Sequence, residues 1–226
     1  MPTHWVPIHR TLPGFIIDPR LMQFPNARIA LFGKAPEAGK VKTRLLPAVS
    51  AEEAAVIYSG LLQQTVANLA RARLAPIDCW CTPDVTHPFF QNLVDEFGVS
   101  LKQQKGDDLG QRMRMAVAKT SAESVILIGG DCPVLEPDHL NRAFSWLQSD
   151  CDAVLGPAED GGYVLLGLNR CDESLFNDIP WGGERVLSMT RERLQQLDWR
   201  WRELEVLWDL DRPRDLERYR AQHLRT

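Results

Sequence analysis

A loop rich in glycine and positive charge follows the first apolar run of the chain, residues 29–32. Gly33 ends this run, and Gly39 follows after five more residues. Glycines let a backbone approach an anion closely, and cations neutralise charge that backbone amides alone cannot. We therefore interpret the loop as a phosphate site. Its candidate binding residues are Gly33, Lys34, Gly39, Lys40, Lys42 and Arg44, and Lys40 is also a candidate catalytic cation.

The spacing of this loop fits neither of the two commonest phosphate-binding designs. A Walker loop reads G-x-x-x-x-G-K-S/T, whereas five residues separate Gly33 from Gly39 and Val41 follows Lys40. The dinucleotide pattern G-x-G-x-x-G is also absent from the sequence. The loop thus indicates a phosphate or nucleotide ligand of another design, and a solvated basic turn is the alternative.

Acidic residues follow two further apolar runs. Asp131 comes after residues 125–128 and two glycines, while Asp209 and Asp211 follow the last expected strand. A buried carboxylate is costly unless it meets a cation, and Mg²⁺ and Mn²⁺ prefer oxygen ligands. We therefore predict a metal ligand at Asp131, with a helix cap as the alternative. Because strand side chains alternate, only one of Asp209 and Asp211 can face the same site.

Two more segments place polar residues beside glycines. Arg112 follows Asp108 and can reach a phosphate, although an acidic helix cap explains the segment equally well. Asp160 precedes Gly161 and Gly162, which let a backbone approach a ligand but also suit a tight hairpin. An acid at position 160 is a candidate base toward an acceptor hydroxyl.

Strand and helix patterns alternate along the chain, which predicts an α/β fold: a three-layer αβα sandwich around a mainly parallel sheet. Ligands of such sheets lie beyond the carboxyl ends of the strands, so the basic loop and the acidic segments are expected at one edge. The expected strands are 29–32, 76–82, 99–103, 125–128, 153–155, 163–166 and 201–208. The expected helices are 51–73, opened by a capping box at 50–53, then 89–97, 109–120, 136–147, 184–197 and 213–223.

The composition is that of an ordinary globular chain of 226 residues with a net charge of −4. The negative charge argues against a nucleic-acid partner, and no apolar run reaches the length of a membrane span. Five cysteines without a C-x-x-C pattern favour free thiols and a cytoplasmic location. Residues 1–26 hold several prolines and no continuous apolar stretch, so an irregular extension is expected before one domain over 27–226.

Several motifs, in order, resemble the DUF2064 family. They are residues 34–45, 108–113, 130–133, 156–163 and 209–211, and the likeness runs from about Arg28 to the C-terminus. The resemblance implies a Rossmann-like GT-A fold, as in nucleotide-diphospho-sugar transferases, with a nucleotide-activated donor and a divalent metal. It implies that the basic loop binds the nucleotide phosphates together with Asp108 and Arg112.

The same resemblance implies roles for the acids and for an acceptor site. Asp131 and Asp211 would hold the metal, and the acceptor would contact Asp160, Gly161, Gly162, Tyr163 and Trp181. The chain departs from the family pattern at two places. Gly130 stands where a serine is common, and Gly182 and Gly183 stand where a Ser-Thr pair is usual, which removes two hydroxyls near the expected acceptor.

Three functions compete at this level. The first is a glycosyltransferase that uses a nucleotide-sugar donor and a small-molecule acceptor. The second is a nucleotidyltransferase of the guanylyltransferase kind, which joins a nucleoside monophosphate to a phosphorylated small molecule and releases pyrophosphate. The third is a nucleotide-binding protein without catalytic activity. The products distinguish the first two, since only a glycosyltransferase releases a nucleoside diphosphate.

Overall fold

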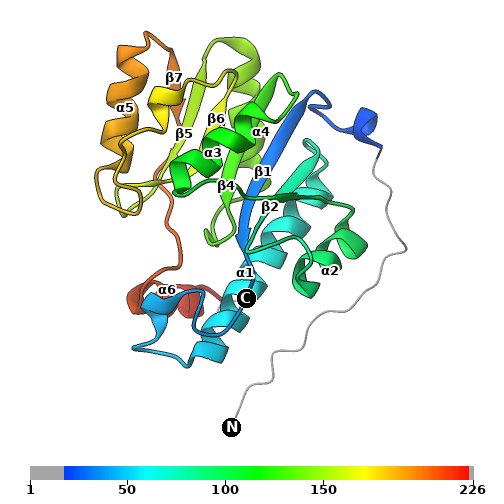
Figure 1. Cartoon of the computed structure of the whole chain (residues 1–226), viewed down its shortest axis with the longest axis vertical. Helices are drawn as coiled ribbons and strands as arrows, with labels where there is room; N and C mark the ends of the chain where they lie inside the picture. Colours follow the sequence, from blue (N-terminus) through cyan, green and yellow to red (C-terminus); the bar gives the residue numbers. More distant parts are fainter. Residues whose placement is uncertain (1–17, 224–226) are drawn as a thin grey trace.

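The computed structural model describes residues 18–223, which form one seven-stranded sheet in the order β3-β2-β1-β4-β6-β5-β7 (Figure 1). The pairs among β3, β2, β1 and β4 are parallel, as is the pair of β5 with β7. The α/β fold with a mainly parallel sheet is thus confirmed. The strands are β1 (Ala27–Lys34), β2 (Ile77–Thr82), β3 (Ser100–Gln103), β4 (Ser124–Gly129), β5 (Ala153–Pro157), β6 (Tyr163–Leu168) and β7 (Trp201–Glu203).

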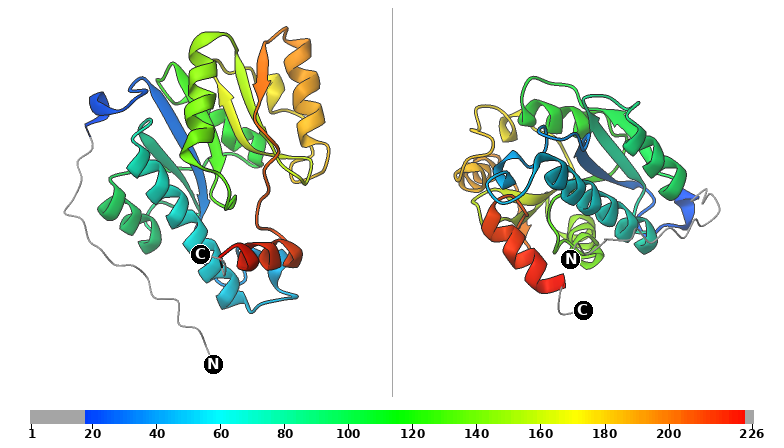
Figure 2. Two further views of the ribbon diagram at one scale, coloured as in Figure 1. Left: turned by 180° about the vertical axis from the view of Figure 1, so that it is seen from behind. Right: turned by 90° about the horizontal axis from the view of Figure 1, so that it is seen from below.

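Helices cover both faces of the sheet, which makes the predicted three layers (Figure 2). One face is covered by α1, α2 and α4, and the other by α3 and α5. The last helix, α6, packs instead against the start of α1 and a short 3₁₀ turn, η2 (Thr43–Leu45). The helices are α1 (Ala51–Ala72), α2 (Pro88–Phe97), α3 (Leu109–Ala118), α4 (Pro137–Ser149), α5 (Val186–Gln196) and α6 (Pro213–His223), with short turns η1 (Pro19–Leu21) and η3 (Glu173–Leu175).

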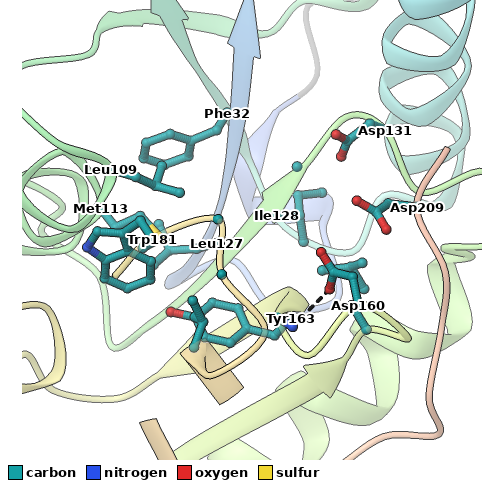
Figure 3. Close-up of a pocket in the computed structure, with 17 residues that line it drawn as sticks. Phe32, Leu109, Met113, Leu127, Ile128, Asp131, Asp160, Tyr163, Trp181 and Asp209 are labelled. Carbon is teal, nitrogen blue, oxygen red and sulfur yellow. Dashed lines mark hydrogen bonds between the residues drawn. The ribbon is translucent and has the colours of Figure 1, made fainter. Parts of the chain in front are cut away.

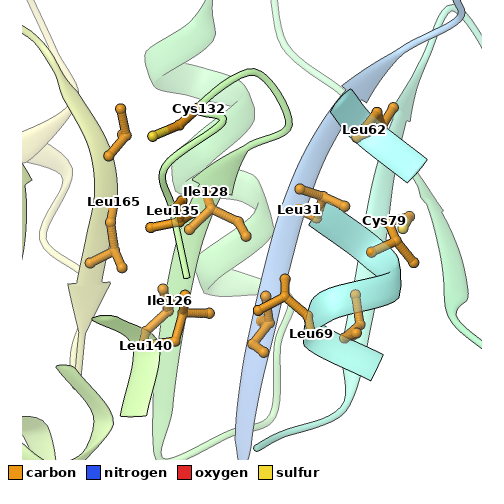
Figure 4. Packing of buried hydrophobic residues seen from close by; sticks show 14 of the residues in the cluster. Leu31, Leu62, Leu69, Cys79, Ile126, Ile128, Cys132, Leu135, Leu140 and Leu165 are labelled. Carbon is orange, nitrogen blue, oxygen red and sulfur yellow. The ribbon is translucent and has the colours of Figure 1, made fainter. Parts of the chain in front are cut away.

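Side-chain alternation along β1 sends its residues to two separate cores. Ile29 and Leu31 pack into the core under α1, α2 and α4, where Figure 4 shows Leu31 facing Leu62 of α1. Ala30 packs on the opposite side, in the core under α3 and α5. This strand lies between β2 and β4 and is covered on both faces, which explains its almost unbroken apolar sequence.

The strand β6 runs against both of its neighbours. It pairs antiparallel with β4 and with β5, because a tight turn at residues 158–162 sends the chain straight back from β5. A two-stranded return of this kind needs no crossover helix. The hairpin explanation for Gly161 and Gly162 is therefore correct as far as the backbone is concerned.

The last expected strand, 201–208, is too long. β7 ends at Glu203, and beyond it only Leu207 forms a bridge, with Ala158. The apolar alternation that suggested a longer strand fails at Val206, which is 61% exposed. The chain instead leaves the sheet as an irregular segment that buries Leu204, Leu207 and Trp208.

Part of the expected irregular N-terminal extension packs onto the sheet layers. Within residues 18–26, η1 forms a short turn, and Phe24 is buried with its ring 5.0 Å from that of Phe144. Residues 1–17 lie outside the described part of the chain. Within residues 18–223, all helices are too short or too polar to cross a membrane. All five cysteines are free thiols, and Cys79 and Cys81 are buried in the core.

The helix α1 begins as its sequence predicts. The Ser50 hydroxyl accepts a hydrogen bond from the Glu53 backbone N–H at 3.1 Å, the first half of a capping box. The second half is replaced, because the Glu53 carboxylate pairs with Arg220 of α6 at 2.7 Å. This pair helps to hold the C-terminal helix beside the start of α1.

The end of β4 is packed directly on α1. A Cβ atom added at Gly130 would overlap the side chain of Leu62, which is itself 1% exposed. Gly130 therefore allows the chain to pass over α1 at the position from which Asp131 projects. A serine here would require Leu62 to move.

We expect Gly130→Ser to lower the free energy of unfolding by about 1–3 kcal/mol, because the added side chain overlaps Leu62, which is buried and would have to repack. Gly60→Ala is the matched control in α1, since an added Cβ there meets no atom within 4 Å. This control should raise stability by about 0.5–1 kcal/mol. Urea unfolding of both variants measures the effects, and a Gly130→Ser protein as stable as the wild type would contradict this account.

Candidate functional site

Backbone hydrogen bonds bring three acidic segments together at the carboxyl end of β4. The N–H of Leu210 donates to the carbonyl of Asp131 at 2.9 Å, which joins the C-terminal segment to the loop after β4. The N–H of Glu159 donates to Leu207 at 2.9 Å and joins the β5–β6 turn to the same segment. The expectation that loops distant in sequence meet at one edge of the sheet is confirmed for these segments.

A cavity of about 280 Å³ opens beside these segments (Figure 3). Three carboxylates, those of Asp131, Asp160 and Asp209, lie at one end of it, and Figure 3 shows them in a row. Aromatic and aliphatic side chains form the other walls. The lining residues beyond the acids are Phe32, Leu109, Met113, Leu127, Ile128, Gly129, Ala158, Gly162, Tyr163, Val164, Trp181, Gly182, Gly183 and Val186.

The carboxyl group of Asp209 lies half-buried at the cavity end. Burial raises the pKa of Asp209 to about 6, and the negative charges of Asp131 and Asp160 add to the shift. The three acids therefore repel one another across the cavity end. An acid with a raised pKa beside two other carboxylates in a cavity is typical of functional sites.

Asp211 does not line this cavity. Its carboxylate pairs with Arg44 at 2.6 Å and lies 3.8 Å from the ammonium of Lys42. Asp209 thus lines the cavity and Asp211 does not, although neither residue belongs to a strand. The acid that shares the cavity with Asp131 is Asp209, whereas Asp211 belongs to the basic loop.

Lys42 is the cation that joins the basic loop to the acids. Its ammonium lies 3.0 Å from Asp131, and its side chain is only 5% exposed. The backbone of Lys42 is left-handed, with φ at 48°, which costs a non-glycine residue about 1–2 kcal/mol. This conformation turns the lysine inward from the loop onto the two aspartates.

The other residues of the loop are arranged differently. Lys40 is exposed and pairs with Glu37 at 2.6 Å, so its ammonium is not held beside Asp131. Gly39 has φ at 74°, which explains the glycine by turn geometry alone. Lys34 is exposed at the end of β1, and Gly33 is buried against Leu62 and Phe90.

The segment before α3 follows the capping interpretation. Asp108 is the N-cap of this helix and accepts a hydrogen bond from the N–H of Gln111 at 2.8 Å. The Nε of Arg112 donates to the carbonyl of Gly106 at 2.9 Å. Both side chains thus stabilise the loop itself, and neither lines the cavity.

The turn after β5 is fastened to the segment before α5. Gly161 has φ at 88° and lies so close to the carbonyl of Glu184 that a Cβ would overlap it. Its own carbonyl accepts a hydrogen bond from Leu187 at 2.9 Å. The side chain of Asp160 accepts one from the N–H of Gly162 at 2.8 Å, which fixes the carboxylate at the cavity end.

Trp181 and Tyr163 form the aromatic part of the cavity wall. Their rings meet edge to face with centroids 6.5 Å apart. The indole of Trp181 rests on Gly110 of α3, where a Cβ would come within 2.5 Å of its nitrogen. The structure therefore brings together Asp131, Asp160, Gly162, Tyr163 and Trp181, as expected from the sequence.

Sequence reasoning missed most of the apolar wall. Phe32, Leu109 and Met113 were expected only as strand and helix residues, yet all three line the cavity. A core position and a cavity wall have the same apolar periodicity, so no sequence signal separates them. Gly182 and Gly183 also line the cavity, and their departure from the family pattern was the one available signal.

Comparison with known proteins supports the family resemblance. The family model described as an uncharacterized protein conserved in bacteria, DUF2064, matches residues 65–183. The chain belongs to the DUF2064 family. A solved structure from Desulfovibrio desulfuricans G20, provisionally described as a nucleotide-diphospho-sugar transferase, is 32% identical, with 87% of each chain covered and a TM-score of 0.80. No curated protein matches the sequence.

More distant solved structures share the fold of this DUF2064 chain. Glucosyl-3-phosphoglycerate synthase of Mycobacterium tuberculosis, solved with Mn²⁺, UDP and glucosyl-3-phosphoglycerate, is 13% identical, covers 87% of this chain and 76% of its own, and has a TM-score of 0.52. CMP:2-keto-3-deoxy-manno-octonic acid synthetase, solved with CTP, is 13% identical, covers 88% and 99%, and has a TM-score of 0.57. The GT-A-like fold is therefore shown.

We expect Lys42→Met to lower the free energy of unfolding by about 1–2 kcal/mol, because it leaves Asp131 and Asp211 beside each other without the cation between them. The matched control is Lys40→Met in the same loop, whose exposed pair with Glu37 should contribute less than about 0.5 kcal/mol. Equal losses of unfolding free energy for the two variants in urea would show that the buried Lys42 ammonium stabilises the fold no more than the exposed Lys40 ammonium does.

The raised pKa of Asp209 predicts a pH dependence of stability. Because the folded pKa lies above the ordinary 3.8, the folded protein binds this proton more tightly than the unfolded chain does. Its contribution therefore favours folding at low pH and is lost as pH rises from about 4 to about 6. With EDTA present, Asp209→Asn should stabilise the protein by about 2 kcal/mol at pH 7.5 and by almost nothing at pH 4.

Thermal unfolding at the two pH values measures this difference. Asp150→Asn is the control, because Asp150 forms a surface pair with Arg202 away from the cavity. A stabilisation by Asp209→Asn that is the same at both pH values would contradict the assignment.

Proposed function

We propose that this protein is a metal-dependent glycosyltransferase that uses a nucleotide-sugar donor and a small-molecule acceptor. The observation that carries the proposal is the meeting of a basic loop, a row of three carboxylates and a cavity at the carboxyl edge of the sheet. The 32% identity to a protein provisionally described as a nucleotide-diphospho-sugar transferase supports a transferase. The shared fold of the more distant transferases is consistent with it.

The donor phosphates would lie along the loop after β1. Lys34 and Lys40 are exposed there, and Arg44 is half exposed beside Asp211. Cations on one side of a leaving diphosphate stabilise the negative charge that develops as its bond to the sugar breaks. Lys42 would contribute indirectly, because its ammonium holds the Asp131 carboxylate in place.

The acids of the cavity fit a divalent cation. Carboxylate oxygens are the ligands that Mg²⁺ and Mn²⁺ prefer, and Asp131 and Asp209 stand at the same cavity end. The negative charges of Asp131 and Asp160 contribute to the raised pKa of Asp209. A divalent ion bound between these acids would neutralise part of that charge. We therefore assign Asp131 and Asp209 as the holders, in place of the pair Asp131 and Asp211, because Asp211 does not line the cavity and is paired with Arg44.

The cation would draw further ligands from outside the protein. Within residues 18–223, no three acidic, histidine or cysteine groups lie close enough together to hold a metal by themselves. Mg²⁺ commonly keeps waters and takes phosphate oxygens beside one or two carboxylates. When bound, the ion would supply positive charge to the leaving diphosphate.

Asp160 would act on the acceptor. Its carboxylate lies at the cavity end and is oriented by the Gly162 N–H. The acceptor oxygen forms the new bond to the sugar carbon, its proton passes to Asp160, and the bond to the diphosphate breaks with its electron pair on the diphosphate. The products are the glycosylated acceptor and a nucleoside diphosphate.

A thermal-shift panel of nucleoside diphosphates, nucleoside triphosphates and nucleotide sugars, with Mg²⁺ or Mn²⁺, tests the proposal. At least one nucleotide sugar should stabilise the protein, and only with a divalent ion. A response to triphosphates alone, with pyrophosphate released in the presence of an acceptor, would replace it with a nucleotidyltransferase. Nucleotide binding without turnover of any acceptor would leave a binding protein.

We expect Asp131→Asn to remove the metal dependence of nucleotide binding, because it deletes one of two carboxylates that hold the ion. Calorimetry of UDP or of the best nucleotide from the panel, with and without Mn²⁺, measures this. Binding with Mn²⁺ should weaken at least about tenfold, about 1.4 kcal/mol. Asp150→Asn, on the far surface, is the control, and unchanged Mn²⁺-dependent affinity in Asp131→Asn would rule out the metal role.

A further inference from the structure

The chemistry of the cavity wall limits what can occupy it. Among the described residues that line it, the only charged side chains are the three carboxylates of Asp131, Asp160 and Asp209. The wall contains no lysine, arginine or histidine, and no serine, threonine, asparagine or glutamine. Apart from the acids, its polar side-chain atoms are those of Tyr163 and Trp181.

The cations of the neighbouring loops do not supply positive charge to the cavity wall itself. Lys42 is paired with Asp131 and Arg44 with Asp211, and neither lines the cavity. Arg112 is held by the carbonyl of Gly106. Arg185 is the cation next to the lining residue Val186, but it is exposed and does not line the cavity.

An anionic group inside the cavity would therefore be repelled by the acids and desolvated by the apolar wall. Both effects act in the same direction, because a buried charge needs an opposite charge or hydrogen-bond donors. A divalent ion at Asp131 and Asp209 would reduce the repulsion, but it would be engaged with the donor phosphates. The opposite end of the cavity, away from the acids, would remain apolar.

That end has the form of an aromatic and aliphatic cleft. Phe32 stands on β1, Leu109 begins α3, and Trp181 closes the side near Tyr163 (Figure 3). Trp181 packs against Gly110, so this part of the wall is formed without a ligand. Flat apolar groups gain the most from such a preformed surface.

The rim beside Trp181 carries no side chain. Gly182 and Gly183 line the cavity, and Gly182 has φ at 81° with no atom within 4 Å of an added Cβ. The two positions leave room at the mouth and offer no hydroxyl to a polar substituent. The space fits an extended apolar body better than a sugar phosphate, which needs many hydrogen-bond partners.

We propose that the acceptor is a molecule with an apolar, preferably aromatic, body that bears a hydroxyl or amine and no phosphate or carboxylate. The inference rests on the proposed transferase function and adds the class of its acceptor. It also separates the proposed glycosyltransferase from the alternative nucleotidyltransferase, whose phosphorylated substrate would have to enter the cavity.

The test uses three probes with one body: benzyl alcohol, benzylamine and benzyl phosphate. Ligand-observed NMR measures binding of benzyl alcohol to the full chain, and the other two are added as competitors. Competition reports only the cavity, so binding of benzyl phosphate at the basic loop does not interfere. Benzylamine should displace benzyl alcohol, and benzyl phosphate should displace it at least about tenfold less well.

Two variant pairs locate the effect. Trp181→Ala should weaken benzyl alcohol at least about fivefold, whereas Trp146→Ala, on α4 outside the cavity, should not change it. Leu109→Lys places a cation on the wall and should let benzyl phosphate compete, whereas the neutral control Leu109→Gln should not. Leu109 is 43% exposed at the start of α3, so the substitution leaves the core intact.

Three outcomes would overturn the inference: no binding of benzyl alcohol, equal competition by benzyl phosphate in the wild type, or no effect of Trp181→Ala. Binding of UDP with Mn²⁺ is measured on the same protein by calorimetry. If benzyl alcohol binds selectively but no nucleotide binds, the proposed transferase function is wrong, although the cavity does select apolar ligands. If UDP binds with Mn²⁺ but the cavity does not distinguish the three probes, the proposed function stands and the inference about the acceptor is wrong.

Discussion

A single buried ammonium holds together the two halves of this site. Lys42 projects from a left-handed position in the loop after β1 and reaches Asp131 at 3.0 Å and Asp211 at 3.8 Å. These acids come from the end of β4 and from the segment before α6, so one side chain joins three distant parts of the chain. An unpaired carboxylate or ammonium at this depth would be costly, which makes the arrangement interdependent.

This pairing determines which acids remain available. Lys42 pairs with Asp131 and Arg44 pairs with Asp211, so Asp160 and Asp209 are the two acids of the cavity end without a close cation. Burial raises the pKa of Asp209, and repulsion from Asp131 and Asp160 adds to the shift, while Lys42 offsets part of it. The negative charge of the cavity is thus a consequence of how the basic loop is used.

The sheet divides the site into two chemically different regions. The parallel half, β3-β2-β1-β4, ends in the basic loop, where phosphate groups are favoured. The antiparallel return of β6 beside β4 places the turn of Asp160 and the wall residue Tyr163 on the other side. In the proposed reaction, the donor phosphates would lie at the basic loop and the apolar body of the acceptor would lie in the cavity.

The sequence by itself determined the fold class, the approximate elements and the meeting of acidic segments, since carboxyl ends of strands share one edge. It also identified Asp131, Asp160, Tyr163 and Trp181, which the structure gathers around one cavity. Only the tertiary structure decided that Asp209 rather than Asp211 faces that cavity. Residues 204–211 leave the sheet after β7, so strand alternation could not orient them.

Tertiary structure also decided which lysine is buried and which residues form the apolar wall. Lys40 and Lys42 are alike in sequence, yet only Lys42 takes the backbone conformation that turns it inward. Phe32 and Leu109 have the periodicity of core residues, and whether a core position borders a cavity depends on how distant segments pack. Those contacts are long-range, and no local pattern of residue types records them.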